Sequence, residues 1–321
     1  MIRTRLTLAV LVLLMGLGLT TGCSKASSKK VVAVIPKGQA HIFWQTVHAG
    51  AAAAGKEFNL TIEWNGPPAE NDFSQQVEIV ENFISRRVDG IVLAPTTEKG
   101  LVNVIEKAKK EGIPVTIFDS AADTQDYVSF VATDNYAGGQ MAAKRLGQIL
   151  HGKGNVAIIA TMPGGASTTA RELGFEETLA KDFPAMKVVA KQFGMSDYAK
   201  SLAVSEDILT ANQNLNGMFA SNESSAVGAV QALKARGLGG KIPFVGFDSS
   251  QPLLDALKDG IVDSLVLQDP YKMGYEGVKS LADLWTGRTP AKRIDSGARL
   301  VTREDLDKPE FQKLLHPPLV F

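Results

Sequence analysis

Cysteine is almost absent from this chain, and neither sign of charge is in excess. The 321 residues include a single cysteine, Cys23, which excludes a disulfide scaffold and a metal cluster held by thiolates. Lysine and arginine total 34, as do aspartate and glutamate, so no basic excess favours nucleic acid or an anionic membrane. A hydrophobic content of 45% excludes intrinsic disorder. The chain should fold by hydrophobic burial and form roughly two domains, at about 150 residues each.

Long apolar runs are also scarce, and the longest lies near the N-terminus at residues 6–19, after Arg3 and Arg5. It is shorter than the ~20 residues of a membrane-spanning helix. A basic start, an apolar run and a small-residue exit are typical of a secretory signal peptide. Cys23 resembles the lipidated cysteine of a bacterial lipobox, although Thr20 stands where that motif usually has leucine.

We therefore expect residues 1–22 to be a lipoprotein signal peptide, Cys23 to be the lipidation site and residues 23–30 to be a flexible tether. The alternative is an ordinary secretory signal that is cleaved nearby and leaves an incidental cysteine. In both cases the protein is exported from the cytoplasm.

From residue 31 onward, short apolar β-rich runs alternate with amphipathic stretches. Strands are expected at residues 31–35, 60–64, 90–94, 114–118, 128–132, 156–159, 187–190, 217–220, 244–247 and 264–267. Helices are expected at residues 42–58, 73–84, 98–111, 136–151, 168–182, 197–211, 224–236, 252–258 and 271–286. This alternation predicts an α/β fold with doubly wound parallel sheets. About a dozen strands are too many for one small sheet, so two sheets are expected.

Polar residues stand at the ends of several predicted strands. Ligands of open α/β sheets bind at the carboxyl ends of the strands, and those ends carry Asp119, Asn222, Asp248 and Gln268. Each residue alone is compatible with a helix cap or a turn, but the four together favour a shared site. Arg171 lies in the first turn of a predicted helix, where a cation opposes the helix dipole, so we expect it to face an anionic or polar partner.

Rings cluster just after the first strand, at His41, Phe43 and Trp44. Charged and amide groups beside flat apolar rings suit a sugar, whose hydroxyls need directional hydrogen bonds and whose C–H faces pack on aromatic rings. For Phe43 and Trp44 the alternative is packing in the core. For His41 the alternatives to a direct ligand contact are capping the helix or supporting a neighbouring contact.

Motifs for catalysis and nucleotide binding are missing. The chain has no G-x-G-x-x-G after its first strand, no phosphate-binding G-x-x-x-x-G-K-[ST] loop and no G-x-S-x-G. The four histidines show no metal-ligand spacing. Asp119 and Asp248 are compatible with an acid–base pair, but nothing in their spacing favours one. We therefore expect a binding protein without catalytic residues, cofactor or metal.

A series of ordered motifs between Val31 and Val301 carries a family resemblance. They are F-W-x-x-V-x-x-G-A at 43–51, V-D-G-I-V-L-A-P at 88–95, I-P-V-T-I-F-D at 113–119, A-T-D-N at 132–135, G-G-x-x-A at 138–142, A-R-E-L-G-F at 170–175, F-A-S-N-E at 219–223 and F-V-G-F-D at 244–248. With these motifs the chain resembles the periplasmic sugar-binding proteins of the ribose-binding type, the solute receptors of ABC importers. By similarity, the ligand-contacting positions are Phe43, Trp44, Asp119, Arg171, Asn222, Asp248 and Gln268.

The chain departs from the family pattern at several positions. His41 stands where the family often has asparagine, and Glu223 where aspartate is common. Ser120 stands where ribose-specific members have an arginine after the aspartate, which implies a larger pocket and argues against ribose as the ligand.

The resemblance implies two lobes joined by three crossings, near Asp134, Gln268 and Ser296, that close on a ligand like a hinge. Lobe 1 would comprise residues 31–134 and 269–296. Lobe 2 would comprise residues 135–268 and 297–321, including a tail at 302–321 for which the sequence suggests no role.

The sequence therefore predicts a monomeric receptor, lipid-anchored in the periplasm or on the outer face of the cell membrane. It would capture a neutral monosaccharide or polyol and deliver it to an ABC transporter permease. Its contact with the membrane would be through the lipid only, and nucleic acid is not an expected partner. The alternative is a sensory module that presents its ligand to a membrane histidine kinase or chemoreceptor. The export signal and the missing helix-turn-helix exclude a cytoplasmic LacI-type repressor.

Overall fold

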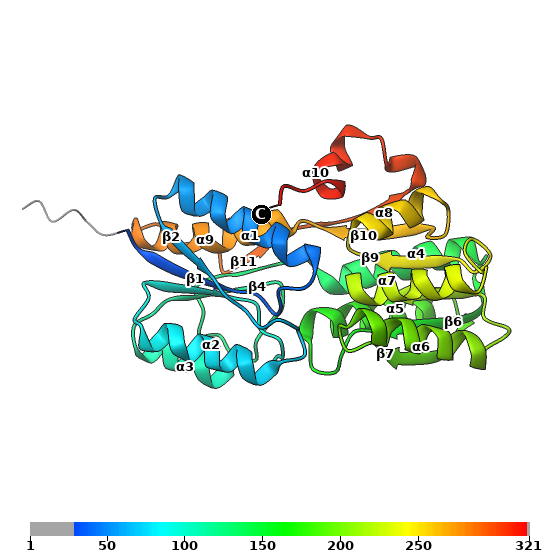
Figure 1. Ribbon diagram of the computed structural model, residues 1–321, viewed down its shortest axis with the longest axis horizontal. Helices are drawn as coiled ribbons and strands as arrows, with labels where there is room; N and C mark the ends of the chain where they lie inside the picture. The colour runs from blue at the N-terminus through cyan, green and yellow to red at the C-terminus, as the bar shows by residue number, and fades with distance from the viewer. Residues whose placement is uncertain (1–28, 320–321) are drawn as a thin grey trace, which may run out of the picture.

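Twelve strands form two separate sheets in the computed structural model, which describes residues 29–319. The strands of the first sheet are β1 (Val31–Ile35), β2 (Thr61–Trp64), β3 (Gly90–Leu93), β4 (Val115–Phe118), β5 (Phe130–Ala132) and β11 (Arg293–Asp295). Those of the second are β6 (Lys153–Ala160), β7 (Ala185–Phe193), β8 (Gly217–Ala220), β9 (Phe244–Phe247), β10 (Ser264–Gln268) and β12 (Ala298–Thr302). The two sheets lie in the two halves of an elongated molecule (Figure 1).

The strand order shows the doubly wound pattern twice. The first sheet has the order β11-β5-β4-β3-β1-β2 and is parallel throughout. The second has the order β12-β10-β9-β8-β6-β7 and is parallel except for β12, which runs antiparallel to β10. The predicted α/β fold class is therefore confirmed, with one antiparallel edge strand that the expectation of parallel sheets did not include.

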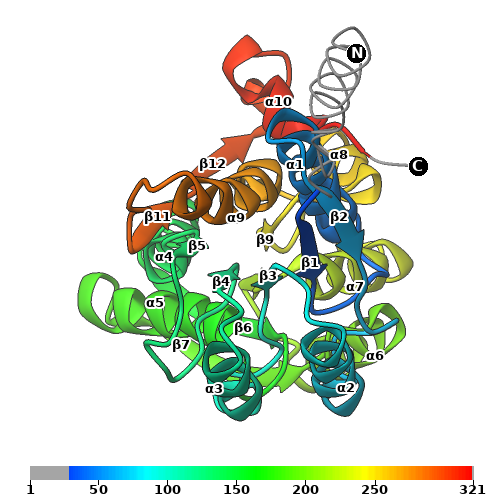
Figure 2. The same ribbon diagram turned by 90° about the vertical axis from the view of Figure 1, so that its left-hand side faces the viewer.

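Helices cover both faces of each sheet (Figure 2). On the first sheet, α1 (Ile42–Glu57) and α9 (Pro270–Trp285) cover one face, and α2 (Phe73–Ser85) and α3 (Val102–Lys110) cover the other. On the second sheet, α4 (Asn135–Ile149) and α5 (Ala166–Asp182) lie opposite α6 (Tyr198–Ala211), α7 (Glu223–Ala235) and α8 (Gln251–Lys258). Below, the first lobe is the first sheet with its four helices, and the second lobe is the second sheet with its five helices and the C-terminal segment.

Burial of the strands on both faces explains their continuous apolar sequences. Every residue of β3, β4, β8 and β9 is buried. Each lobe has two apolar clusters, one on either side of its sheet. This packing holds the carboxyl ends of the strands, where the polar residues stand, on a rigid frame.

Helices α4 and α5 approach so closely that only glycine fits between them. A Cβ atom on Gly139 would lie 1.9 Å from the carbonyl oxygen of Arg171, and one on Gly174 would lie 2.2 Å from the carbonyl oxygen of Tyr136. The two helix backbones are therefore in direct contact. This contact fixes the position of the helix that carries Arg171.

The C-terminal part differs from the sequence-based expectation. The strands β11 and β12 were not predicted, because they are short and contain few apolar residues in a row. They are followed by two short 3₁₀ helices (Arg303–Asp305 and Pro309–Phe311) and by α10 (Gln312–Leu315), whose Leu315 is buried in the core of the second lobe.

Other boundaries shifted for local reasons. Helix α3 begins at Val102 rather than at residue 98, because Thr97 Oγ1 accepts a hydrogen bond from the Gly100 amide and stabilises a turn there. Strand β7 extends well beyond the predicted residues 187–190 on both sides. The predicted signal peptide and the lipidation site Cys23 lie outside the described residues. Within residues 29–319, no helix is both long and apolar enough to cross a membrane.

Candidate functional site

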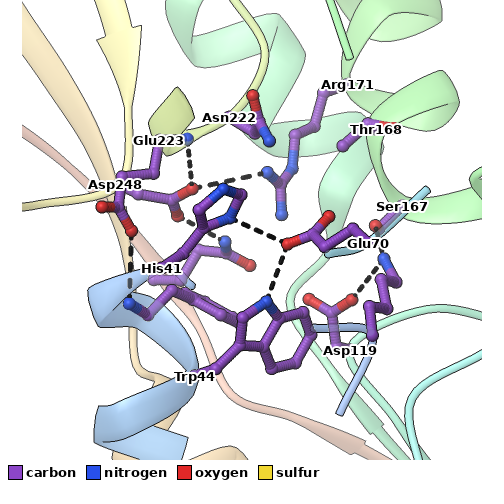
Figure 3. Close-up of a pocket in the computed structure, with 13 residues that line it drawn as sticks. His41, Trp44, Glu70, Asp119, Ser167, Thr168, Arg171, Asn222, Glu223 and Asp248 are labelled. Atoms are coloured by element: carbon purple, nitrogen blue, oxygen red, sulfur yellow. Dashed lines mark hydrogen bonds and ion pairs between the residues drawn. The ribbon is translucent and has the colours of Figure 1, made fainter. Parts of the chain in front are cut away.

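A cavity between the two lobes collects charged, polar and aromatic side chains (Figure 3). Its lining residues are Lys37, His41, Phe43, Trp44, Glu70, Asp119, Ser167, Thr168, Arg171, Asn222, Glu223, Asp248 and Gln268. All eight residues that the sequence suggested as ligand contacts lie in this lining. The residues come from both lobes, so the cavity exists only where the lobes meet.

A buried ion pair closes one end of the cavity. The Lys37 ammonium lies 2.6 Å from Asp119 Oδ2 and donates a hydrogen bond of 3.0 Å to Ser167 Oγ of the second lobe. Lys37 was missed in the sequence, where a lysine between proline and glycine after β1 is typical of a solvent-exposed loop. Its burial beside a carboxylate is the signal that identifies it.

Ser120 contacts the opposite lobe. Its hydroxyl oxygen accepts a hydrogen bond of 3.0 Å from the Ser167 amide. The cation beside Asp119 is Lys37, from the loop after β1. Ribose-specific members instead have an arginine at the position of Ser120.

Glu70 is the centre of a second buried group. Its Oε1 lies 2.9 Å from His41 Nδ1 and accepts a hydrogen bond of 2.7 Å from Trp44 Nε1. Burial would lower the pKa of His41, but Glu70 outweighs this and raises the pKa to about 9. Burial would likewise raise the pKa of Glu70, but His41 lowers it to about 2. The two side chains thus form a charged pair at neutral pH.

His41 supports its neighbours rather than capping α1. It occupies the position before the helix, but its side chain makes no capping hydrogen bond. The ring packs edge-on against Tyr198 of the second lobe, with ring centroids 5.2 Å apart. Capping, one of the predicted alternatives, is therefore wrong for this side chain.

Phe43 and Trp44 belong to the core and to the cavity at the same time. Both are members of the apolar cluster between α1 and the first sheet, and both line the cavity. Their rings meet edge-on with centroids 4.9 Å apart. Packing in the core and a position in the cavity lining are therefore compatible for both residues.

Arg171 is held rigidly on α5. Its Nε donates to Asn135 Oδ1 at 2.8 Å, and its Nη1 donates to the Ser221 carbonyl at 2.9 Å. The guanidinium lies 3.9 Å from the centre of the Phe247 ring, and Nη1 is 4.0 Å from Asp248 Oδ2. Because α5 begins at Ala166, Arg171 lies in the second turn rather than the first, and the argument from the helix dipole is weaker than expected.

Asp248 and Gln268 are joined at the opposite wall. Gln268 Nε2 donates to Asp248 Oδ1 at 2.6 Å, and the Glu223 amide donates to Asp248 Oδ2 at 3.0 Å. Burial raises the pKa of Asp248, although Arg171 opposes this effect. Gln268 Oε1 is buried and has no hydrogen-bond partner among residues 29–319, so it is an acceptor available to a ligand.

Asn222 and Glu223 lie at the start of α7. Asn222 caps the helix by accepting a hydrogen bond of 3.0 Å from the Ser225 amide, so the cap interpretation holds for it even though it also lines the cavity. Glu223 Oε2 accepts from the Phe43 amide of the first lobe at 3.2 Å. Burial raises the pKa of Glu223.

Reasoning from the sequence missed Lys37, Glu70, Ser167 and Thr168, and it noted Glu223 only as a departure from the family pattern. Glu70 and Ser167 lie in or next to loops without a strand-end signal, and only the meeting of the lobes brings them to the cavity. Across residues 29–319, no group of histidine, cysteine, aspartate or glutamate side chains is arranged to hold a metal ion. The site offers charge-assisted hydrogen bonds in several directions beside two aromatic rings.

Comparisons with known proteins identify the family of this chain. Residues 32–289 match the family model described as a periplasmic binding protein domain. A D-ribose/D-allose-binding protein of Pseudomonas aeruginosa is 33% identical over 280 residues, which cover 85% of this chain and 87% of the relative. By their names, the relatives are binding proteins and not enzymes.

Solved structures of solute-binding proteins share the fold. One from Agrobacterium radiobacter, in complex with D-arabinose, superposes with a TM-score of 0.88 and 34% identity over 90% of this chain and all (100%) of that protein. Another from Agrobacterium vitis, with bound D-fucose, gives a TM-score of 0.87 and 38% identity over 89% and 100% of the two chains. From the fold, the cavity between the lobes and these matches, we conclude that the chain belongs to the periplasmic binding protein domain family.

Proposed function

We propose that this protein captures a neutral monosaccharide or polyol outside the cytoplasm and delivers it to the permease of an ABC importer. The observation that carries the proposal is the interlobe cavity, where acidic, basic and amide groups surround the rings of Phe43 and Trp44. Such a lining supplies donors and acceptors for many hydroxyls and an apolar surface for the C–H face of a sugar ring.

The enclosure of the cavity by side chains of both lobes supports a small ligand. A single sugar unit suits such an enclosed site better than an oligosaccharide. The sugars named for the relatives and related structures, among them D-allose, D-arabinose and D-fucose, are all monosaccharides.

Opposite charges in the lining support a neutral ligand. Lys37 is paired with Asp119, His41 with Glu70, and Arg171 lies near Asp248. Because each cation already has a carboxylate nearby, an anionic ligand would leave a buried charge uncompensated, which is costly. Burial raises the pKa of Glu223, the fourth carboxylate of the lining, which favours its neutral form. Hydroxyl groups can bridge these pairs without adding charge.

The proposed lobes comprise residues 31–134 with 269–296, and residues 135–268 with 297–321. We propose closure about the three crossings as the capture step. The family match supports export, and the N-terminal sequence supports anchoring through a lipid on Cys23. We propose that the anchored protein is a monomer. The alternative, a sensory module for a kinase or chemoreceptor, would use the same site. A neighbouring permease gene would indicate transport, and a neighbouring kinase gene would indicate sensing.

A thermal-shift screen of sugars, polyols and other small metabolites tests the proposal. We expect a higher melting temperature with at least one monosaccharide or polyol, because a ligand that binds only the folded state stabilises it. Mass spectrometry of the small molecules released from purified protein would then identify the natural ligand. Stabilisation by other metabolites only would refute the ligand class.

A further inference from the structure

We infer that Ser196, which does not line the cavity, is a positioning residue that sets ligand affinity by binding Glu70 across the two lobes. The inference rests on the function proposed above, since it concerns how the same cavity is kept closed. It assigns a role to a hydroxyl group outside the cavity lining and to a carboxylate for which the sequence suggested none.

The contact is direct and buried. Ser196 Oγ of the second lobe donates a hydrogen bond of 2.8 Å to Glu70 Oε2 of the first lobe. The other carboxylate oxygen of Glu70 is the one that contacts His41 and Trp44 within the first lobe. Glu70 therefore contacts its own lobe through one carboxylate oxygen and the opposite lobe through the other.

Ser196 continues the connection into the second lobe. Its oxygen accepts a hydrogen bond of 3.1 Å from Asn222 Nδ2, and Asn222 lines the cavity. A chain of hydrogen bonds thus runs from Trp44 through Glu70 and Ser196 to Asn222. It joins predicted ligand contacts of the two lobes by a path that does not pass through the ligand.

The segment that presents Ser196 has an uncommon backbone. Met195 and Ser196 are consecutive non-glycine residues in the left-handed region, with φ values of 55° and 53°. Surrounding contacts must hold such a conformation. One of them also crosses between the lobes, from Asn71 Nδ2 to the Met195 carbonyl at 3.4 Å.

This geometry makes a specific prediction about affinity. When the lobes separate, Glu70 keeps its partners in the first lobe but loses Ser196, so the Glu70–Ser196 bond stabilises only the closed form. A bond that exists only in the closed form slows ligand release, and it leaves association almost unchanged where the ligand-free protein is mostly open.

The test compares Ser196→Ala, Glu70→Gln, their double variant and the control Ser205→Ala. Ser205 is also a buried serine of the second lobe, but its hydroxyl bonds to the Ser201 carbonyl within α6. Release and association rates are measured with whichever of D-ribose, D-allose, D-arabinose or D-fucose gives the largest thermal shift.

We expect Ser196→Ala and Glu70→Gln each to weaken affinity about tenfold through faster release. The double variant should lose less than the sum of the two single losses, because both single variants weaken the Glu70–Ser196 bond, while Glu70→Gln also loses the charge that pairs with His41. Ser205→Ala should bind like the wild type. If Ser196→Ala stays within roughly twofold of the wild type, or if the two losses add, the inference is wrong.

A second measurement does not need a ligand. Spin labels at Lys107→Cys on α3 and Ala203→Cys on α6, in a Cys23→Ser background, report the distance between the lobes of the ligand-free protein. We expect a closed population that falls in Ser196→Ala and Glu70→Gln but not in Ser205→Ala. If the wild type, both variants and the control show the same closed population, or no closed population at all, the inference is wrong. If none of the sugars binds but the populations differ as expected, the proposed ligand is wrong and the inferred role of Ser196 stands.

Discussion

Asp119 and Asp248 occupy matching positions in the two lobes, each directly after a buried strand and each in the left-handed region, with φ values of 60° and 69°. Few non-glycine residues adopt this conformation, and aspartate is among those that do so most readily. Both carboxylates also line the cavity. The two lobes therefore contribute equivalent groups from opposite sides. Strain of this kind is concentrated at functional sites.

Two substitutions at Asp248 separate the effect of its charge on binding from the effect of its backbone conformation on stability. Asp248→Asn keeps the shape and tolerates the left-handed region, so we expect weaker ligand binding with little change in melting temperature. Asp248→Val places a β-branched residue there and should destabilise the fold by about 1–3 kcal/mol. Isothermal titration and thermal melting measure the two effects. Equal stability of the two variants would show that the backbone conformation imposes no constraint.

Loss of either charged contact from the cavity should reduce affinity. We expect Asp119→Ala and Arg171→Ala each to weaken binding by about 2 kcal/mol, close to thirtyfold, while the fold stays intact. Arg145→Ala is a suitable control, because Arg145 pairs with Asp263 outside the cavity lining, through Nε at 2.6 Å. Titration of the best ligand into each variant measures the change. Undiminished binding in both cavity variants would refute the site assignment.

The His41–Glu70 pair should make stability depend on pH. The ordinary pKa of histidine, 6.5, rises to about 9 in the fold, and that of glutamate, 4.5, falls to about 2. The contribution of the pair to the free energy of unfolding is therefore complete between pH 4.5 and 6.5. It declines as the pH rises through about 9, where His41 loses its proton, and as the pH falls toward 2, where Glu70 gains one.

Melting temperatures of the wild type and Glu70→Gln across this pH range measure the effect. The difference between the two should be largest in the plateau and shrink on both sides. Glu63→Gln, which removes an exposed partner of Arg86, should follow the wild-type curve. A constant difference between the wild type and Glu70→Gln would contradict the assignment of charge to this pair.

The contact between α4 and α5 should not tolerate a methyl group. Gly139→Ala would push the Arg171 carbonyl away, and we expect a loss of about 1–3 kcal/mol in the free energy of unfolding. Lys144→Ala, at an exposed position of the same helix, should have little effect. Urea unfolding of both variants provides the measurement. Similar midpoints would show that the helices can separate without cost.

The sequence was sufficient for the fold and for much of the cavity, because both follow from local patterns. Buried strands are continuous apolar runs, and polar residues at their ends pointed to Asp119, Asn222, Asp248 and Gln268, all of which line the cavity. Whether these residues contact a ligand stays a prediction. The N-terminal signal and the lipid on Cys23 likewise stay predictions.

The remaining features depend on tertiary contacts. Lys37 and Glu70 have no pattern of their own, and their partners lie at distant positions, Asp119 and His41 among them. The strands β11 and β12 are stable only because β5 and β10 offer them free edges. The position of Arg171 within α5 was misjudged because the helix begins two residues earlier than its apolar pattern indicates.

The return of the chain to its first sheet also has a consequence for the order of folding. Strand β11 pairs with β5, and helix α9 packs against α1, yet five strands of the second sheet lie between β5 and α9 along the chain. A chain that emerges with its N-terminus first therefore cannot complete its first lobe until residues 293–295 are available. Contacts so distant in sequence slow folding, so a newly made chain stays incompletely folded until this returning segment has been made.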